Sequence, residues 1–347
     1  GNVDENSPVD NASSLDYYYM FFGGTERKMG TLSTALDYYL GNLKIKAVFS
    51  PLHATNRLPL GDDDFPIRLP IYPDQTEMFP LNGLPYEGGI YSTLSTNIGD
   101  FSVSYFSGYD RIFNFSGANE YFSSTFNSYR LEPNLVFGYR KTNVMGIGFT
   151  LLNNYFTIRA DAGFFNTMDE NNSIERPIPI LSVQDEWYDS LAFSYPLEEK
   201  AEYEQYTIQL ELELPLSINL TSQYFFYNLV TYSANDTLPD IEIDIPGFSY
   251  DPNQLSDLFI PGMGVPLATL TNKAIFLTLD KTFMDDQLKI SYTSMMDIAD
   301  YSGIQGIAGS LMEIRMEYSI TQDLQSLLGM TQVNGSKDHP DGENYPF

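Results

Sequence analysis

The chain has 347 residues and carries 46 acidic against 18 basic side chains, which gives a formal net charge of −28. This charge argues against nucleic acid as a partner, because phosphate binding requires a basic surface. Cysteine is absent, so the sequence excludes disulfides and thiol chemistry. Tyrosine is abundant, with 26 residues, as in proteins whose rings lie between lipid and water.

The segment 1–13 is polar and acidic, and it begins without the pattern of a signal peptide. We interpret it as a mature or truncated start, and a soluble cytoplasmic origin is the competing interpretation. The sequence contains no run of about 18 apolar residues, so no transmembrane helix is expected.

Beyond this segment, most of the chain alternates between polar and apolar residues. A period of two residues is the signature of a β-strand with two unlike faces. In 200–214, for example, Ile208 and Leu210 share one face, while Thr207 and Gln209 share the other. The predicted strands in chain order are 14–22, 31–40, 43–50, 88–98, 101–114, 128–152, 155–167, 200–214, 218–233, 268–283, 287–298, 305–320 and 324–334.

The segment 128–152 admits two assignments. If the segment is divided into two strands at residues 140–143, the next long loop would leave the sheet at the same end as the short turns. We therefore predict one long strand bent near Gly138 or Gly146, because glycine often marks bends and bulges. The number of strands is then odd, whereas bacterial barrels usually have an even number. We expect that a final strand is missing after residue 347 and that the chain is a fragment.

Three segments, 50–87, 168–199 and 234–267, are predicted to be long loops. They hold 15 of the 20 prolines, and proline cannot donate a hydrogen bond to a sheet. They also contain 20 acidic and 3 basic residues, a net charge of −17. The remaining connections, such as Gly41-Asn42 and Asp285-Asp286, are short turns. Outer-membrane barrels have this asymmetry of short periplasmic turns and long external loops.

The apolar faces of about a dozen predicted strands have no helical domain to cover them, and a soluble protein would not leave such faces uncovered. We predict an all-β fold in which residues 1–347 form one transmembrane antiparallel β-barrel of about 14 strands, within a range of 12–16. The main rival is a soluble β-sandwich or β-propeller with Leu210 and Leu212 in a closed core. The residues expected to face lipid are Ile208, Leu210, Leu212, Ile275, Leu277, Leu279, Ile314 and Met316.

Charged residues at alternate positions identify candidate pore-lining side chains. Both signs occur, so the lumen is expected to sort solutes by charge or to hold a ladder of cross-strand ion pairs, and both can be true. Arg159 and Asp161, two residues apart on one face, suit such a ladder. The candidate pore-lining residues are Lys44, Lys46, Arg159, Asp161, Glu211, Glu213, Asp280, Lys289, Glu313, Arg315 and Glu317.

The densest acidic cluster is Asp62, Asp63 and Asp64. These residues are candidate Ca²⁺ ligands, because Ca²⁺ binds carboxylate and carbonyl oxygens on turns. Their spacing does not match an EF-hand loop, and a solvated turn is the alternative. No other cofactor is expected. The segment 50–87 around them is rich in proline and apolar residues, so we expect it to fold into the barrel, with an external cap as the alternative.

Catalysis has little support in the sequence, and no enzyme activity is expected. The two histidines, His53 and His339, lie far apart in predicted loops and outside any metal-ligand spacing. The sequence has neither a nucleophile-elbow motif nor a phosphate-binding glycine loop.

One family pattern covers about residues 31–170. It consists of Leu131-x-Pro133, Tyr139-Arg140, Asn143-Val144-x-Gly146-Ile147-Gly148 and Ile158-Arg159-Ala160-Asp161-Ala162-Gly163-x-Phe165, with a Pro-rich run after Phe49-Ser50-Pro51. This pattern resembles uncharacterised porin-like outer-membrane β-barrels of Gram-negative bacteria. The resemblance implies the fold and the location, and it implies little about cargo. The chain departs from the pattern by lacking a terminal aromatic strand.

The expected function is passive passage of small solutes through a channel in the bacterial outer membrane, with a mild preference for cations. The alternative is a structural or surface-interaction barrel with a closed lumen, whose acidic loops bind a partner or divalent cations. Outer-membrane lipid, lipopolysaccharide and small solutes are the expected partners. A homo-oligomer or a partner protein stays open.

Overall fold

The computed structural model describes residues 1–4, 6–19, 27–58, 78, 81, 84–123, 130–170, 173–175, 180–181, 187–235, 256, 259–299, 307–321 and 324–335. Within these ranges the chain is built from β-strands, with short 3₁₀ turns such as η1 (Tyr17–Tyr19) and η4 (Pro266–Thr269). Every pairing between strands is antiparallel. The prediction of an all-β, antiparallel protein is therefore confirmed. No helix in the described ranges is long and apolar enough to cross a membrane.

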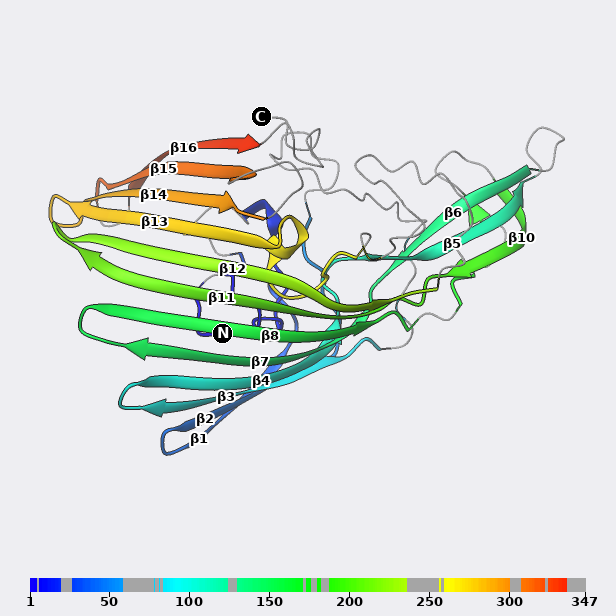
Figure 1. The fold of residues 1–347 in the computed structure, drawn as a ribbon, viewed down its shortest axis with the longest axis horizontal. Helices are drawn as coiled ribbons and strands as arrows, with labels where there is room; N and C mark the ends of the chain where they lie inside the picture. The colour runs from blue at the N-terminus through cyan, green and yellow to red at the C-terminus, as the bar shows by residue number, and fades with distance from the viewer. Residues whose placement is uncertain are drawn as a thin grey trace.

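Twelve strands, from β1 to β16, lie side by side and pair to form one continuous sheet (Figure 1). β1 and β16 are its two edges, and within the described residues they are not paired with each other. The structure thus describes an open twelve-stranded sheet, whereas the sequence predicts a closed barrel of about 14 strands. In order across the sheet the strands are β1 (Thr34–Leu40), β2 (Leu43–Ser50), β3 (Glu87–Thr96), β4 (Gly99–Tyr109), β7 (Lys141–Leu152), β8 (Phe156–Met168), β11 (Lys200–Leu214), β12 (Ile218–Ser233), β13 (Lys273–Phe283), β14 (Leu288–Asp297), β15 (Gly309–Ser319) and β16 (Gln325–Gly335).

Tight turns join neighbouring strands at the positions that the sequence predicts. Gly41 has a φ of 58° between β1 and β2, and Asp285 and Asp286 have φ values of 51° and 66° between β13 and β14. Gly99 begins β4 with a φ of 150°, and a Cβ atom there would lie 1.9 Å from the carbonyl oxygen of Thr150. Glycine is therefore required at position 99, both for its backbone conformation and for the close approach of β7.

A second sheet extends beyond one end of the large sheet (Figure 1). Its four strands pair in the order β6 (Arg130–Gly138), β5 (Asn114–Ser123), β10 (Trp187–Pro196) and β9 (Ile180–Leu181). The prediction that 168–199 is only a loop is wrong, because β9 and β10 lie within it. That prediction took the prolines of this segment as evidence against strands. Pro196 is the last residue of β10, and strand ends tolerate a missing N–H group.

The predicted single strand 128–152 is also wrong, because it is two strands in different sheets. β6 ends at Gly138, and β7 begins at Lys141 in the large sheet. Likewise β4 ends at Tyr109, and β5 begins a new strand at Asn114. The chain leaves the large sheet after β4, forms the β5–β6 hairpin, and returns as β7 beside β4.

The predicted strand 14–22 is wrong over its described part. Leu15 and Asp16 form only isolated bridges, to Lys28 and Arg57, and η1 follows. The predicted strand 268–283 begins later, at Lys273, because the 3₁₀ turn η4 occupies the start of that range.

The two faces of the large sheet have opposite character. We call the outer face the one that carries Ile208, and the inner face the one that carries Gln209. Ile208 is 50% exposed, whereas Gln209 is fully buried. Of the residues predicted to face outward, Ile208, Ile314 and Met316 are exposed and the others are half-buried. Further exposed apolar side chains on the outer face include Leu36, Tyr38, Ile90, Leu94, Val103, Tyr105, Met145, Ile147, Phe164, Tyr224, Ile290, Leu328 and Met330.

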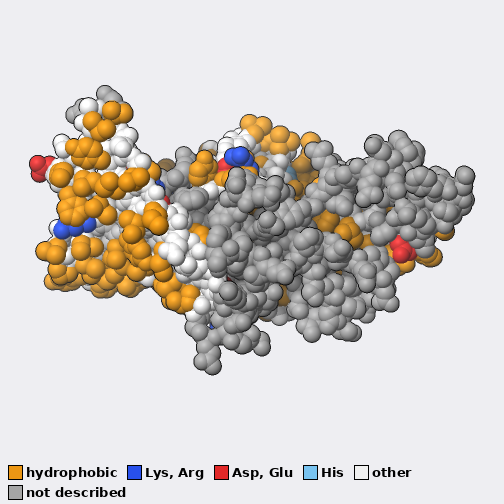
Figure 2. Space-filling model, turned by 90° about the horizontal axis from the view of Figure 1, so that it is seen from above, with side chains coloured by type: hydrophobic (Ala, Val, Ile, Leu, Met, Phe, Trp, Pro, Cys, Tyr) orange, Lys and Arg blue, Asp and Glu red, His pale blue; other side chains and the backbone are white. Residues whose placement is uncertain are grey.

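Hydrophobic side chains gather on the surface at the end of the molecule where the large sheet lies (Figure 2). The buried apolar clusters, by contrast, lie at the strand ends that border the long connections. One of them stacks Phe165 on Tyr203, with ring centroids 4.4 Å apart, and adds Phe259 and Met263 from the chain before β13. The large sheet therefore buries its polar face and exposes its apolar face over most of its area.

Candidate functional site

The inner face of the large sheet is the candidate site, because it is a polar surface that is nevertheless shielded from solvent. Its buried side chains include hydroxyl, amide and carboxyl groups. Residues at the start of the chain lie against its middle (Figure 1), where Asn2 and Asn6 bond to it. The buried polar side chains of this face include Ser102, Asp161, Thr207, Gln209, Gln223 and Glu313.

Two cavities flank this covered region. The mixed-charge cavity has a volume of about 230 Å³ and lies between Asp4, Arg27 and strands β11 to β15. Its carboxylates roughly balance its cations. The charged residues of its lining are Asp4, Asp280, Glu313, Glu317, Arg27, Lys289 and Arg315.

The lysine cavity has a volume of about 480 Å³ and lies between residues 9–13 and strands β1 to β4. Lys28, Lys44 and Lys46 line it, and among the described residues Asp10 is the carboxylate in its lining. Lys28 forms an ion pair with Asp10, and Lys44 lies 3.7 Å from Asp37 on β1. The lysine charge is thus largely neutralised within the site itself.

The structure brings the predicted pore-lining residues to one face of the sheet, in three groups. Lys44 and Lys46 line the lysine cavity. Arg159, Asp161 and Glu211 lie between the cavities, and Glu213 is exposed near the β11–β12 turn. The residues that line the mixed-charge cavity are Asp280, Lys289, Glu313, Arg315 and Glu317.

The predicted ladder of cross-strand ion pairs is present in part. Arg159 Nε on β8 donates to Glu211 Oε1 on β11 at 2.7 Å. Arg315 Nε lies 2.9 Å from Glu317 Oε1, but both residues belong to β15, so this pair does not link two strands. Asp161 has different partners, however. It accepts hydrogen bonds from Asn2, Val3 and Ser7 instead of pairing with Arg159. The two-residue spacing correctly placed Arg159 and Asp161 on one face but could not identify their partners.

A buried ion-pair network joins the two sheets at the strand ends. Arg140 is fully buried and donates to Asp110 at 2.7 Å, to Glu199 at 2.5 Å and to the carbonyl oxygen of Ile260 at 2.5 Å. Its guanidinium group lies 4.5 Å from the ring centroid of Phe259. Burial raises the pKa of Glu199 above its ordinary value, although Arg140 acts to lower it. Burial lowers the pKa of Arg140, but Asp110 and Glu199 more than offset this, so its pKa is raised.

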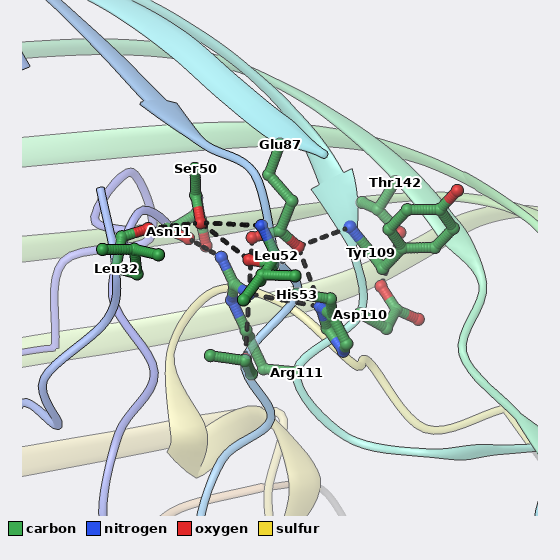
Figure 3. A network of polar contacts seen from close by, with 11 residues as sticks. Asn11, Leu32, Ser50, Leu52, His53, Glu87, Tyr109, Asp110, Arg111 and Thr142 are labelled. Atoms are coloured by element: carbon green, nitrogen blue, oxygen red, sulfur yellow. Dashed lines mark hydrogen bonds and ion pairs between the residues drawn. The ribbon is translucent and has the colours of Figure 1, made fainter. Parts of the chain in front are cut away.

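A second buried network contains His53, Glu87 and Arg111 (Figure 3). His53 Nδ1 lies 2.8 Å from Glu87 Oε1, and Arg111 Nη1 lies 2.8 Å from Glu87 Oε2. Arg111 also donates to the backbone carbonyl oxygens of Asn11 and Ala54, at 2.8 Å and 2.9 Å. The network ties the start of the chain and the end of β2 to the start of β3.

Glu87 orients the His53 ring, as a carboxylate does in many catalytic sites, but among the described residues no nucleophilic side chain is hydrogen-bonded to that ring. His53 Nε2 is buried, and among the described residues it has no hydrogen-bond partner. The hydroxyl of Ser50, which Figure 3 shows near this network, lies 2.8 Å and 2.6 Å from the carbonyl oxygens of Leu32 and Leu52 and donates to one of them instead. The expectation that the chain has no enzyme activity stays a prediction.

Asp62, Asp63 and Asp64 lie outside the described residues, as does most of the segment 50–87, so their proposed roles stay predictions. Within the described ranges, no group of three or more His, Asp or Glu residues is placed to hold a metal ion.

Sequence reasoning missed the role of the first residues, which bind the inner face, and it missed Glu87, Arg111 and Arg140. The sequence did contain one signal for the binding of the first residues to the inner face. Gly146, Gly148 and Gly163 fall on the same strand face, and a row of glycines on a sheet often marks the close approach of another backbone.

Comparisons with known proteins add little to this description. No protein family model matches the chain, and no curated protein matches it. Among solved structures, the chain is similar to the crystal structure of OccK8 (OprE) from Pseudomonas aeruginosa, with 11% sequence identity and a TM-score of 0.28 over 89% of this chain and 77% of that chain. This likeness is too slight to carry an argument about fold or activity, so the functional conclusion rests on the chain's own faces, charges and contacts.

Proposed function

We propose that the chain is a porin-like channel of the bacterial outer membrane, and that small solutes pass passively along the inner face of the large sheet. One observation carries the proposal: the outer face exposes apolar side chains across the sheet, while the polar face is enclosed. A soluble protein places these two faces the other way round.

The energetic argument depends on the solvent that the outer face meets. Removing a side chain of the size of Ile or Leu from water is worth about 1.5–3 kcal/mol. The exposed apolar side chains of the outer face are numerous enough that their transfer to lipid would be worth on the order of tens of kcal/mol. Only helices and closed β-barrels cross a lipid bilayer, because every backbone group there needs a partner. The proposal therefore requires that β1 and β16 have partners in the complete barrel.

The proposed selectivity is a mild cation preference. The three Pro-rich segments carry −17 of the net charge, and charge at a channel mouth concentrates counter-ions within about 8 Å at physiological salt. Along the inner face, the mixed-charge cavity is nearly balanced and the lysine cavity is weakly basic. The acidic segments, and not the inner face, would then set the preference.

A second candidate function is a structural or surface-interaction barrel with a closed lumen. The observation that favours it is the segment that lies across the inner face, since hydrogen bonds from Asn2 and Asn6 hold it there. In this alternative the acidic loops bind a partner or divalent cations, and solutes do not pass.

One experiment separates the two candidates. The purified protein is inserted into planar bilayers, and conductance and reversal potentials are measured with KCl and then with salts of larger cations or anions. Stable conductance with a small cation preference supports the channel. A protein that inserts into the bilayer without conductance supports the closed barrel, and recovery of native protein only from a soluble fraction would contradict both.

A further inference from the structure

The start of the chain forms a built contact with the inner face. We call residues 1–4 and 6–11 the strap. Asp161 on β8 is 2% exposed and accepts four hydrogen bonds from the strap: from Asn2 N at 2.7 Å, Asn2 Nδ2 at 3.0 Å, Val3 N at 2.9 Å and Ser7 Oγ at 2.8 Å. A buried carboxylate with four donors is a strong anchor, because hydrogen bonds to charged groups are stronger than neutral ones.

Amide side chains on the neighbouring strands extend the contact. Gln209 Nε2 donates to Asp4 Oδ2 at 2.8 Å, and Asp4 N donates back to Gln209 Oε1 at 3.3 Å. Asn6 Nδ2 donates to Gln223 Oε1 at 3.0 Å, and its carbonyl oxygen accepts a hydrogen bond from Thr207 Oγ1 at 2.7 Å. The strap thus crosses β8, β11 and β12 with specific partners on each.

The strap is also held at its other end. The carbonyl oxygen of Asn11 accepts a hydrogen bond from Arg111 Nη2 at 2.8 Å, and Asn11 Oδ1 accepts one from Gly264 N at 3.0 Å. Arg111 belongs to the buried network with Glu87 (Figure 3). Both ends of the strap are therefore bound to buried groups of the sheet or its connections.

The sheet leaves room for the strap by using glycine. A Cβ atom on Gly148 would lie 2.3 Å from Asn2 Nδ2, and one on Gly146 would lie 2.4 Å from Val9 Cγ1. A Cβ atom on Gly163 would lie 3.2 Å from Pro8 Cβ. These three glycines lie on the inner faces of β7 and β8, under the strap. The floor of the site is thus shaped to the strap, independently of the hydrogen bonds to Asp161.

We propose that the strap is an internal constriction, positioned by Asp161, that divides the inner face into the lysine cavity and the mixed-charge cavity and limits passage between them. Asp4 lines one cavity while Gly1 and residues 9–13 line the other. The hydrogen bonds and glycine contacts above support the docking of the strap without any assumption about function. Only the effect of the strap on passage rests on the proposed function.

The test uses the absence of cysteine from the chain. Val3 belongs to the strap and is only 4% exposed, so a Val3→Cys reporter reacts slowly with a water-soluble thiol reagent while the strap is docked. The full chain carrying this reporter is compared with versions that also carry Asp161→Asn or Asp280→Asn. Asp280 is the matched control, because it lies on the same face and, among the described residues, accepts its hydrogen bond from Asn219 on β12 and not from the strap. Far-UV circular dichroism and heat-dependent gel mobility check that each version is folded.

Asp161→Asn should raise the labelling rate at least about tenfold, because the amide removes the charge and turns a donor toward the donors of Asn2 and Val3. Asp280→Asn should leave the rate within about twofold, since it breaks no strap contact. If Asp161→Asn does not fold, Ser7→Ala removes one of the four hydrogen bonds and should raise the rate about threefold. Equal rates in all versions would overturn docking by Asp161.

Single-channel conductance tests the constriction. Asp161→Asn should raise conductance relative to Asp280→Asn, although both remove one negative charge from the same face. Faster labelling without a conductance change would overturn the constriction while leaving the anchor in place. Absence of conductance in every version would contradict the proposed channel, and the labelling rates would still decide whether Asp161 holds the strap.

Discussion

Arg140 Nε donates a 2.7 Å hydrogen bond to Asp110 Oδ2, and both side chains are fully buried. Asp110 follows the last residue of β4, and Arg140 precedes the first residue of β7, so this contact closes the base of the β5–β6 excursion. Glu199, just before β11, adds a third charge. The pair thus marks where the chain leaves the large sheet and where it returns.

Arg140→Met should destabilise the fold by about 3–5 kcal/mol, because it leaves two buried carboxylates without a cation. The matched control is Arg57→Met, which removes an exposed pair with Asp16 and should cost less than about 1 kcal/mol. Urea unfolding of protein inserted into vesicles measures both, with the single tryptophan, Trp187 on β10, as the fluorescent reporter. Similar costs for the two variants would show that the buried network does not hold the sheets together.

The same variant should show a pH-dependent defect. Burial already raises the pKa of Glu199 above its ordinary value of 4.5, and Arg140 acts to lower it, so the loss of Arg140 raises this pKa further. A carboxyl whose pKa is raised in the folded state stabilises the fold below pH 4.5, and this contribution is lost as pH rises through the folded-state pKa. The stability gap between Arg140→Met and the natural sequence should therefore narrow from pH 7 to pH 4. A gap that stays constant or widens on acidification would contradict this account.

A lysine on the outer face should be costly, and one on the inner face should be tolerated. Ile208→Lys places a charge in the apolar band and should cost about 2–4 kcal/mol if that band meets lipid. Thr278→Lys is the control, because Thr278 lines the mixed-charge cavity. Folding yield into lipid vesicles and urea unfolding give the comparison. Equal tolerance of both lysines would mean that the outer face does not lie in a bilayer.

Removal of acidic charge from the segment 50–87 should weaken cation preference. Changing Asp62, Asp63 and Asp64 together to Asn reduces the negative field at the proposed external mouth, and the effect should fade at high salt as screening increases. The Asp285→Asn, Asp286→Asn double variant is the control, since it acts at a short turn. Reversal potentials in KCl gradients measure both. An anion preference in the unmodified channel, or no change in the triple variant, would show that these residues do not control entry.

Local pattern was enough to predict much of the large sheet. The alternation around Ile208 and Gln209 correctly placed them on opposite faces, and dipeptides such as Asp285-Asp286 marked the tight turns. Both signals are local, because strand periodicity and turn conformation depend on residues close together in the chain. The same periodicity placed the charged residues of the candidate site on one face.

Tertiary structure alone decided where strands break and what the charged residues bind. Arg140 and its partners Asp110 and Glu199 are 30 and 59 residues apart in sequence, and only folding brings them together to end β4 and begin β7. Asp161 and Asn2 are 159 residues apart, so the sequence alone shows the strap only as a polar segment and does not indicate its partner. A buried charge takes its partner from whichever distant segment folding brings within hydrogen-bond distance, and no local period records that choice.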